Sequence, residues 1–173
     1  RRTVELMPEH ISAYSLILEE GTPFFERYGD GRGEGLLPDE DAEREMYHRT
    51  KEYLKRQGYK RYEISNYARE GRECRHNIGY WTEVAYLGLG LGASSYMEGC
   101  RFTNEKDLDK YLALDFGEED PEKRETALRK LWGQIEELSQ AQRMEEFMFL
   151  GLRMLKGVSD VDFVRLFGVK MET

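Results

Sequence analysis

The chain has 173 residues, enough for one domain with a sizeable core or for one domain and part of another. Its formal net charge of −8 argues against a general nucleic-acid-binding protein, because such proteins neutralise phosphates with an excess of Lys and Arg. No apolar run reaches the roughly 20 residues of a membrane span and no basic-then-apolar leader opens the chain, so we expect a cytoplasmic protein.

The first third of the chain predicts a strand, a loop and a helix. Residues 11–18 form a nearly continuous apolar run, typical of a strand that is covered on both faces in a parallel sheet. Residues 29–35 carry four glycines and predict an exposed, mobile loop. A helix is expected from about residue 39 to 57, because acidic residues open it and Gly58 follows it.

Two further strands are expected, over residues 59–67 and 85–96. In the second, leucines alternate with Gly88, Gly90 and Gly92, so one face of a strand would carry leucine side chains and the other none. The bare face predicts a close approach, by a neighbouring helix or by a ligand. Strand, helix and strand in this order indicate an α/β fold built from βαβ units.

Helices dominate the predicted structure beyond Asn104. We expect a short helix over residues 107–114, a charged linker over 117–124 and a helix marked by apolar residues from 127 to 138. Ser139 and Gln142 form a capping-box pattern that opens another helix, with Gly157 as its end. The residues expected to face inward from this helix are Met144, Phe147, Met148 and Leu155. Ser159 is expected to cap a last helix through Phe167.

Several motif matches lack the context that their chemistry requires. Residues 88–93 match the dinucleotide pattern G-x-G-x-x-A, but no helix is expected to begin there and hold a pyrophosphate. Cys74 and His76 lack further nearby ligands for zinc, and Cys74 and Cys100, the only cysteines, are expected to be free thiols. The three histidines suggest no nucleophilic triad, and acidic residues on the C-terminal helices argue against a DNA-binding helix-turn-helix.

The segment His76–Trp81 combines an imidazole, an amide and two large aromatic rings. An iron porphyrin readily accepts an imidazole as an axial ligand, and neighbouring Tyr and Trp rings can cover the face of the macrocycle. The same residues also suit an ordinary core, in which the histidine is hydrogen-bonded and the rings bury area. From the residues alone, both interpretations remain open.

Six segments together resemble one protein family. They are residues 10–16 (HISAYSL), 20–24 (EGTPF), 62–68 (YEISNYA), 76–81 (HNIGYW), 86–95 (YLGLGLGASS) and 145–153 (EEFMFLGLR). In these segments the chain is similar to the C-terminal half of the HemW-type haem chaperones, radical S-adenosylmethionine proteins related to oxygen-independent coproporphyrinogen III oxidase. The chain opens at Arg1 rather than Met, which agrees with a part of a longer protein.

The resemblance implies a domain order. Residues 1–115 would be the last strands and helices of a partial (β/α) radical S-adenosylmethionine barrel. Residues 116–138 would be a linker and connecting helix, and residues 139–173 the start of a truncated helical C-terminal domain of the HemN type. Ile17 and Ser94 would contact S-adenosylmethionine at strand ends. The family's [4Fe–4S] cluster requires a C-x-x-x-C-x-x-C motif that this chain lacks, so we expect the chain to be inactive by itself.

The resemblance also implies a function, haem binding and delivery to recipient proteins. His76 would ligate the haem iron, Asn77 would fix the local geometry, and Tyr80 and Trp81 would face the porphyrin. Arg69, Arg72 and Arg75 are candidates for the propionates, or are simply solvated. The rival interpretation is an enzyme of porphyrin biosynthesis that oxidatively decarboxylates coproporphyrinogen III. The identity of the recipients, membrane-associated ones among them, and a dimeric state remain open.

Overall fold

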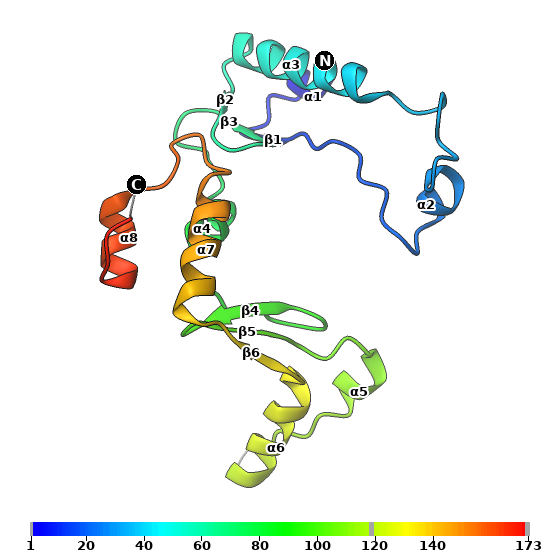
Figure 1. Cartoon of the computed structure of the whole chain (residues 1–173). Coiled ribbons are helices and arrows are strands. Elements are labelled where there is room, and N and C mark those ends of the chain that lie inside the picture. Colours follow the sequence, from blue (N-terminus) through cyan, green and yellow to red (C-terminus); the bar gives the residue numbers. More distant parts are fainter. Residues whose placement is uncertain (1, 118–119, 172–173) are drawn as a thin grey trace. The chain divides into compact units, whose positions relative to one another are not determined.

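The structure, a computed structural model, describes residues 2–117 and 120–171. The chain divides into two compact units. The first unit consists of Arg1–Arg75 with Arg153–Lys156, and the second of His76–Leu152 with Gly157–Thr173. Helices and two small three-stranded sheets make up the described residues, which confirms the predicted mixed α/β class (Figure 1).

The first unit is a small sheet with one long helix. Its elements are α1 (Arg2–Glu5), β1 (His10–Ser12), α2 (Pro23–Tyr28), α3 (Glu40–Arg56), β2 (Lys60–Arg61) and β3 (Asn66–Ala68). The strand order is β1-β3-β2, and Tyr67 at the centre lies opposite both Ile11 and Arg61. Both pairings are antiparallel, so the expected parallel sheet is wrong for these strands. Only four residues join β2 to β3, whereas a parallel pair needs a crossover of about a dozen residues.

Two of the predicted strands are shorter than expected. The apolar run from residue 11 to 18 is extended strand only in β1, and residues 13–18 have no regular structure. The segment from residue 59 to 67 is divided between β2 and β3 by a turn, in which the Glu63 carboxylate accepts a hydrogen bond from the Ser65 backbone at 2.9 Å. Apolar content alone does not show where a chain turns.

The predicted long helix is confirmed as α3, which lies alongside the sheet in Figure 1. The Asp39 side chain caps it by accepting a hydrogen bond from the Ala42 amide at 2.8 Å. Near its C-terminal end Leu54 packs with Tyr59 and Tyr67 into the core of the first unit. The Tyr59 hydroxyl also donates to the Pro8 carbonyl at 2.6 Å, so this buried polar group is satisfied.

The second unit contains a second antiparallel sheet and most of the helices. Its elements are α4 (Arg75–Trp81, in this unit from His76), β4 (Ser94–Met97), β5 (Cys100–Thr103), α5 (Leu108–Leu112), α6 (Pro121–Trp132), β6 (Ile135–Glu137), α7 (Gln140–Gly151) and α8 (Asp160–Phe167). The strand order is β4-β5-β6 (Figure 1).

The leucine–glycine segment is a loop, so the strand expected over residues 85–96 is wrong as far as residue 93. Gly90 and Gly92 have positive φ angles of 99° and 65°, which interrupt an extended strand. The buried Asn104 amide holds the loop by donating to the carbonyls of Gly88, at 3.3 Å, and Gly90, at 2.8 Å. The close approach that the glycines predict is made by the chain itself, because a Cβ at Gly88 would collide with the Ser94 carbonyl oxygen.

The later helices follow the cap signals of the sequence. Ser139 and Gln142 form the predicted capping box of α7, Ser159 caps α8, and Asp107 caps α5. Residues 118 and 119 of the expected charged linker lie outside the described residues, and α6 already begins at Pro121.

Three details of these helices differ from expectation. The helix expected through residue 138 ends at Trp132, because Gly133 has a positive φ of 50° and Ile135–Glu137 pairs with β5 as a strand. The helix α7 ends at Gly151 rather than at Gly157, and Leu155 is 54% exposed rather than inward-facing.

An aromatic cluster forms the core of the second unit. Phe147 of α7 meets Phe163 and Phe167 of α8, with ring centroids 5.4 and 5.8 Å away. Met144 and Met148 pack against this cluster, as expected from their helical spacing with Phe147. A second ring pair, Phe102 of β5 and Trp132 of α6, is 4.8 Å apart and joins α6 to the sheet.

Candidate functional site

The candidate haem segment His76–Trp81 is helical and makes up nearly all of α4. In a helix, residues four positions apart lie on the same face. The rings of His76 and Tyr80 accordingly meet edge to face, with centroids 4.6 Å apart and planes inclined by 76°. Both side chains are exposed, so an imidazole is presented at the surface with a phenol ring beside it.

This ring pair begins a row of four aromatic side chains, His76, Tyr80, Tyr86 and Tyr96, which we call the aromatic row. Tyr80 meets Tyr86 at 4.6 Å, and Tyr86 lies 6.4 Å from Tyr96. Backbone hydrogen bonds of 2.8 and 2.9 Å join Tyr86 to Tyr96 on β4. The row passes from the surface at His76 to the interior at Tyr96, which is 7% exposed.

Beside the aromatic row lies a cavity of about 280 Å³, which we call the α4–α7 pocket. All of its lining residues belong to the second unit. They are Tyr80, Trp81, Glu83, Val84, Tyr86, Tyr96, Arg101, Glu146 and Leu150. Three tyrosines and one tryptophan make the wall largely aromatic, and the charged groups converge on it from the end of α4, from β5 and from α7.

Two of these charged groups form a bidentate ion pair. The guanidinium of Arg101 donates to both carboxylate oxygens of Glu146, at 3.2 and 2.7 Å. This hydrogen bonding raises the pKa of Arg101 above its usual value, even though burial acts in the opposite direction. The positive charge of Arg101 is therefore matched within the pocket by Glu146.

The third charged group, Glu83, has no such match. Both of its carboxylate oxygens are buried, and neither has a hydrogen-bond partner in the part of the chain that the structure describes. Burial raises the pKa of Glu83 to about 7, and the charge of Glu146 adds to the increase while Arg143 and Arg101 oppose it. The residue also has a positive φ of 55°, an uncommon backbone conformation for a side chain other than glycine.

The remaining residues predicted from the sequence lie in several places. Asn77 and Trp81 are half-buried on α4. Ile17 is 74% exposed in the first unit, whereas Ser94 begins β4 in the second and shares a hydrogen bond of 3.1 Å with the Thr103 hydroxyl. Their roles toward haem and S-adenosylmethionine therefore remain predictions.

Two of the three candidate arginines are engaged within the first unit. Arg69 donates to the Pro8 carbonyl at 3.3 Å and its guanidinium lies 5.2 Å from the centre of the Tyr59 ring. Arg72 forms an exposed ion pair with Glu9 at 3.4 Å. Arg75, the first residue of α4, is exposed.

The two cysteines are free, as expected. Cys74 lies in the first unit and Cys100 begins β5 in the second. Among residues 2–117 and 120–171, no three side chains of His, Cys, Asp or Glu gather closely enough to hold a metal ion. Haem differs from a protein-ligated metal ion because a single axial side chain can hold its iron.

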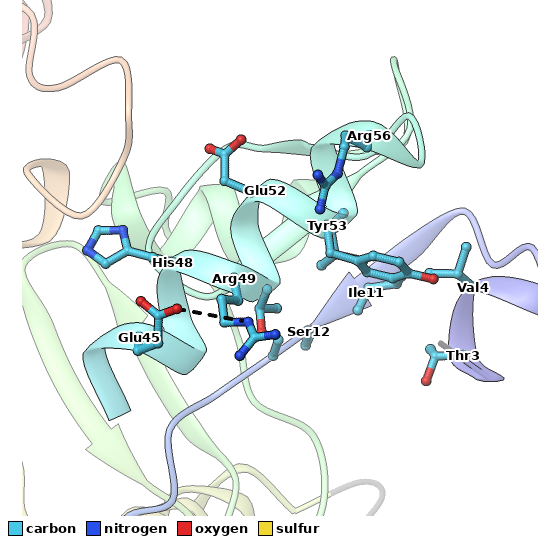
Figure 2. Close-up of a pocket in the computed structure, with 13 residues that line it drawn as sticks. Thr3, Val4, Ile11, Ser12, Glu45, His48, Arg49, Glu52, Tyr53 and Arg56 are labelled. Carbon is cyan, nitrogen blue, oxygen red and sulfur yellow. Dashed lines mark ion pairs between the residues drawn. The ribbon is translucent and has the colours of Figure 1, made fainter. Parts of the chain in front are cut away.

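The first unit has wider cavities that involve few of the predicted residues. One of about 720 Å³ lies between α3, α1 and β1. Figure 2 shows the Tyr53 ring beside Ile11 and Val4, while His48 projects away from them and Glu45 pairs with Arg49 at 3.9 Å. Another, of about 510 Å³, is lined by residues 13–18, including Ile17, and by apolar side chains of α3.

Comparisons with known proteins give the family context. The chain is 38% identical over 169 residues to the haem chaperone HemW of Lactococcus lactis and 36% identical over the same length to that of Bacillus subtilis. Each match covers 98% of this chain and 41% of the relative. The resemblance to the HemW-type haem chaperones is confirmed. The chain spans about two fifths of the length of these relatives.

Two further comparisons concern the fold. Residues 138–173 match the HemN C-terminal domain family. The structure is similar to that of coproporphyrinogen III oxidase (HemN) from Escherichia coli, a radical SAM enzyme, with a TM-score of 0.63 over 97% of this chain and 38% of that one. At 15% sequence identity this similarity shows the fold alone. No helix within residues 2–117 and 120–171 is long and apolar enough to cross a membrane.

Sequence reasoning singled out the residues His76–Trp81 but predicted neither that they form a helix nor the pocket beside them. Glu83, Arg101 and Glu146 are far apart in the sequence and resemble ordinary surface charges there. The single local signal is that Glu83 is the one acidic residue in an aromatic and apolar stretch from Tyr80 to Leu87. Only the pairing of β4 with β5, and the position of α7, bring these charges to one cavity.

Proposed function

We propose that this chain is the haem-binding part of a haem chaperone and that α4 carries the haem contact. The observation that supports this most is the exposed His76 imidazole on α4, in a chain that is similar over 98% of its length to proteins named haem chaperones. Recipient proteins in the cytoplasm, or membrane-associated proteins that receive haem from it, would be the partners.

The residues of α4 fit a haem. Within residues 2–117 and 120–171 the His76 imidazole is exposed, and its ring meets that of Tyr80. An axial ligand must offer an imidazole nitrogen to iron at the surface, and the edge-to-face contact with Tyr80 restrains the exposed ring. Tyr80, 37% exposed, would offer a ring face to the porphyrin.

The other residues of the segment have supporting roles in this proposal. Asn77 follows His76 on α4 and would fix the local geometry by hydrogen bonding, and Trp81 would supply aromatic area one turn beyond Asn77. Of the arginines, Arg75 suits a propionate best because it is exposed and lies on α4 itself, whereas Arg72 already pairs with Glu9.

The chain does not fit a [4Fe–4S] cluster. Its two free cysteines are 26 positions apart in sequence, whereas the radical S-adenosylmethionine motif needs three closely spaced thiolates. Contacts of Ile17 and Ser94 with S-adenosylmethionine are proposed only for a complete barrel, of which residues 1–115 would be one part. Residues 116–138 would connect it to the helical domain of residues 139–173, and the HemN C-terminal match at residues 138–173 supports that division.

Haem titration of matched histidine variants tests the proposal. His76→Ala should abolish or shift the Soret band of the haem complex, because it removes the axial ligand. His48→Ala is the control, since His48 is also exposed on a helix but lies in the first unit. Near-ultraviolet circular dichroism checks that both variants are folded. An unchanged Soret band and affinity in folded His76→Ala would remove this histidine from the mechanism.

A further inference from the structure

The α4–α7 pocket is lined by two carboxylates and one guanidinium, so one carboxylate has no opposite charge within the pocket. Arg101 and Glu146 neutralise each other, which leaves the Glu83 carboxylate. Arg143 influences Glu83 but makes no ion pair with it among the described residues, and its guanidinium donates to the Tyr96 hydroxyl at 3.2 Å and lies over the Phe167 ring. A buried carboxylate without hydrogen-bond donors is costly to keep ionised.

The size of the pocket excludes a porphyrin. Its 280 Å³ is at the lower limit of the roughly 300–1,000 Å³ that is typical of pockets for drug-sized ligands. A porphyrin is larger than such a ligand, whereas a single cationic group with a short alkyl stem can enter. The pocket is therefore too small to be the haem site itself, although the Tyr80 ring borders both the pocket and the exposed surface beside His76.

We propose that the α4–α7 pocket binds a guanidinium group, with the Glu83 carboxylate as its counter-charge and the rings of Tyr80 and Tyr86 as its aromatic wall. The haem proposal does not require this site, although Tyr80 and Trp81 have a place in both proposals. The guanidinium belongs either to a small free guanidine or to an arginine side chain of a partner protein, and both sources present the same chemistry.

The shape of the carboxylate favours guanidinium over ammonium. Both oxygens of Glu83 are buried and lack a partner among the described residues, and a guanidinium would donate two parallel N–H bonds to this pair once the side chains that cover it shift. Its planar cation also stacks on aromatic faces, and Tyr80, Trp81 and Tyr86 line the cavity. Arg101 and Glu146 already show this bidentate geometry within the same pocket.

Binding is expected to depend on pH in a defined direction. Burial raises the pKa of Glu83 to about 7, with Glu146 raising it further and Arg143 and Arg101 lowering it. Tyr80, Tyr86 and Tyr96 also line the cavity, and burial raises the pKa of Tyr86 above its usual value. A cation binds the ionised carboxylate, so affinity should be about tenfold higher at about pH 8 than at about pH 6.

The experiment is a titration of the 173-residue chain, without haem, followed by NMR of its aromatic rings and ¹³C-labelled Glu carboxyls. Two probes are used, methylguanidinium and the blocked peptide acetyl-Ala-Arg-Ala-amide. Saturable shifts of Tyr80, Tyr86 and Trp81 with both probes support an arginine side chain as the source, and shifts with methylguanidinium alone support a small guanidine. Glu83→Gln should weaken binding about tenfold or more, the loss expected when charge-assisted hydrogen bonds are removed.

Glu145→Gln is the matched control, because Glu145 neighbours Glu146 on α7 but does not line the pocket. It should leave the affinity unchanged. If Glu83→Gln does not fold, the unaltered chain still tests the proposal. Bound methylguanidinium stabilises the ionised carboxylate, so it must lower the pH midpoint at which the Glu83 carboxyl titrates. The proposal is overturned if neither probe gives a saturable shift, or if methylguanidinium leaves the titration midpoint of Glu83 unchanged. Because haem is absent, failure here leaves the role of His76 untouched.

Discussion

At the residue scale, Glu83 makes the stability of the second unit depend on pH. Burial raises the pKa of Glu83 from the ordinary 4.5 to about 7, so between these values the folded state binds a proton that the unfolded state has released. The contribution of Glu83 to stability is therefore fully present below about pH 4.5 and is lost as pH rises through about 7.

We predict that Glu83→Gln removes this dependence. A neutral amide has no proton to lose, so the variant should be more stable than the unaltered chain at about pH 8 and should lack the decline between about pH 4.5 and 7. Urea unfolding curves across this range measure the difference. Glu145→Gln, which changes an exposed carboxylate on α7, should keep the decline. If the free energy of unfolding of Glu83→Gln and of the unaltered chain depends on pH in the same way, Glu83 is not the cause of the decline.

At the element scale, helix ends were predictable where one side chain sets them. Asp39, Ser139 and Ser159 each accept a hydrogen bond from an amide three residues on, and this interaction needs no distant partner. The sequence therefore predicted α3, α7 and α8 with starts that the structure confirms. The end of α7 was less predictable, because Gly151 rather than the expected Gly157 closes it.

Strands were less predictable because their partners are distant in sequence. The alternation of leucine with Gly88, Gly90 and Gly92 resembles a strand, but positive φ angles at the last two and hydrogen bonds from Asn104 make it a loop. No pattern within residues 85–96 shows the side chain of Asn104. The same distinction holds for the candidate site. The residues of α4 are adjacent in sequence and were singled out as candidates, whereas the charged residues of the pocket come together only when β4 pairs with β5.

The contact between α7 and α8 gives a prediction for these elements. Phe163 is 3% exposed and meets both Phe147 and Phe167. Phe163→Ala should lower the free energy of unfolding by about 3–5 kcal/mol, because it removes buried area and leaves a cavity. Phe149→Ala is the control, since Phe149 is on α7 but 58% exposed, and it should change stability by less than about 1 kcal/mol. Urea unfolding measures the free energy of unfolding of both variants. Equal decreases in the two variants would show that Phe163 is not part of the core.

At the scale of the whole molecule, the sheet of the first unit has an edge that invites association. In the strand order β1-β3-β2, β1 pairs on one side only within the described residues. The segment that follows it exposes large apolar side chains, with Tyr14 at 66%, Leu16 at 60% and Ile17 at 74%. Unpaired strand edges next to apolar surface are templates for pairing with another chain.

We therefore predict that the 173-residue chain self-associates as its concentration rises, and that the double substitution Leu16→Lys with Ile17→Lys shifts it toward monomer. Lysine beside a strand edge opposes pairing through charge repulsion and lost apolar area. Sedimentation velocity over a concentration series measures the shift. Leu89→Lys is the control, because Leu89 is 84% exposed but belongs to the second unit, and it should leave association unchanged. Monomer at every concentration, or an effect of Leu89→Lys equal to that of the double variant, would show that the segment after β1 does not drive association.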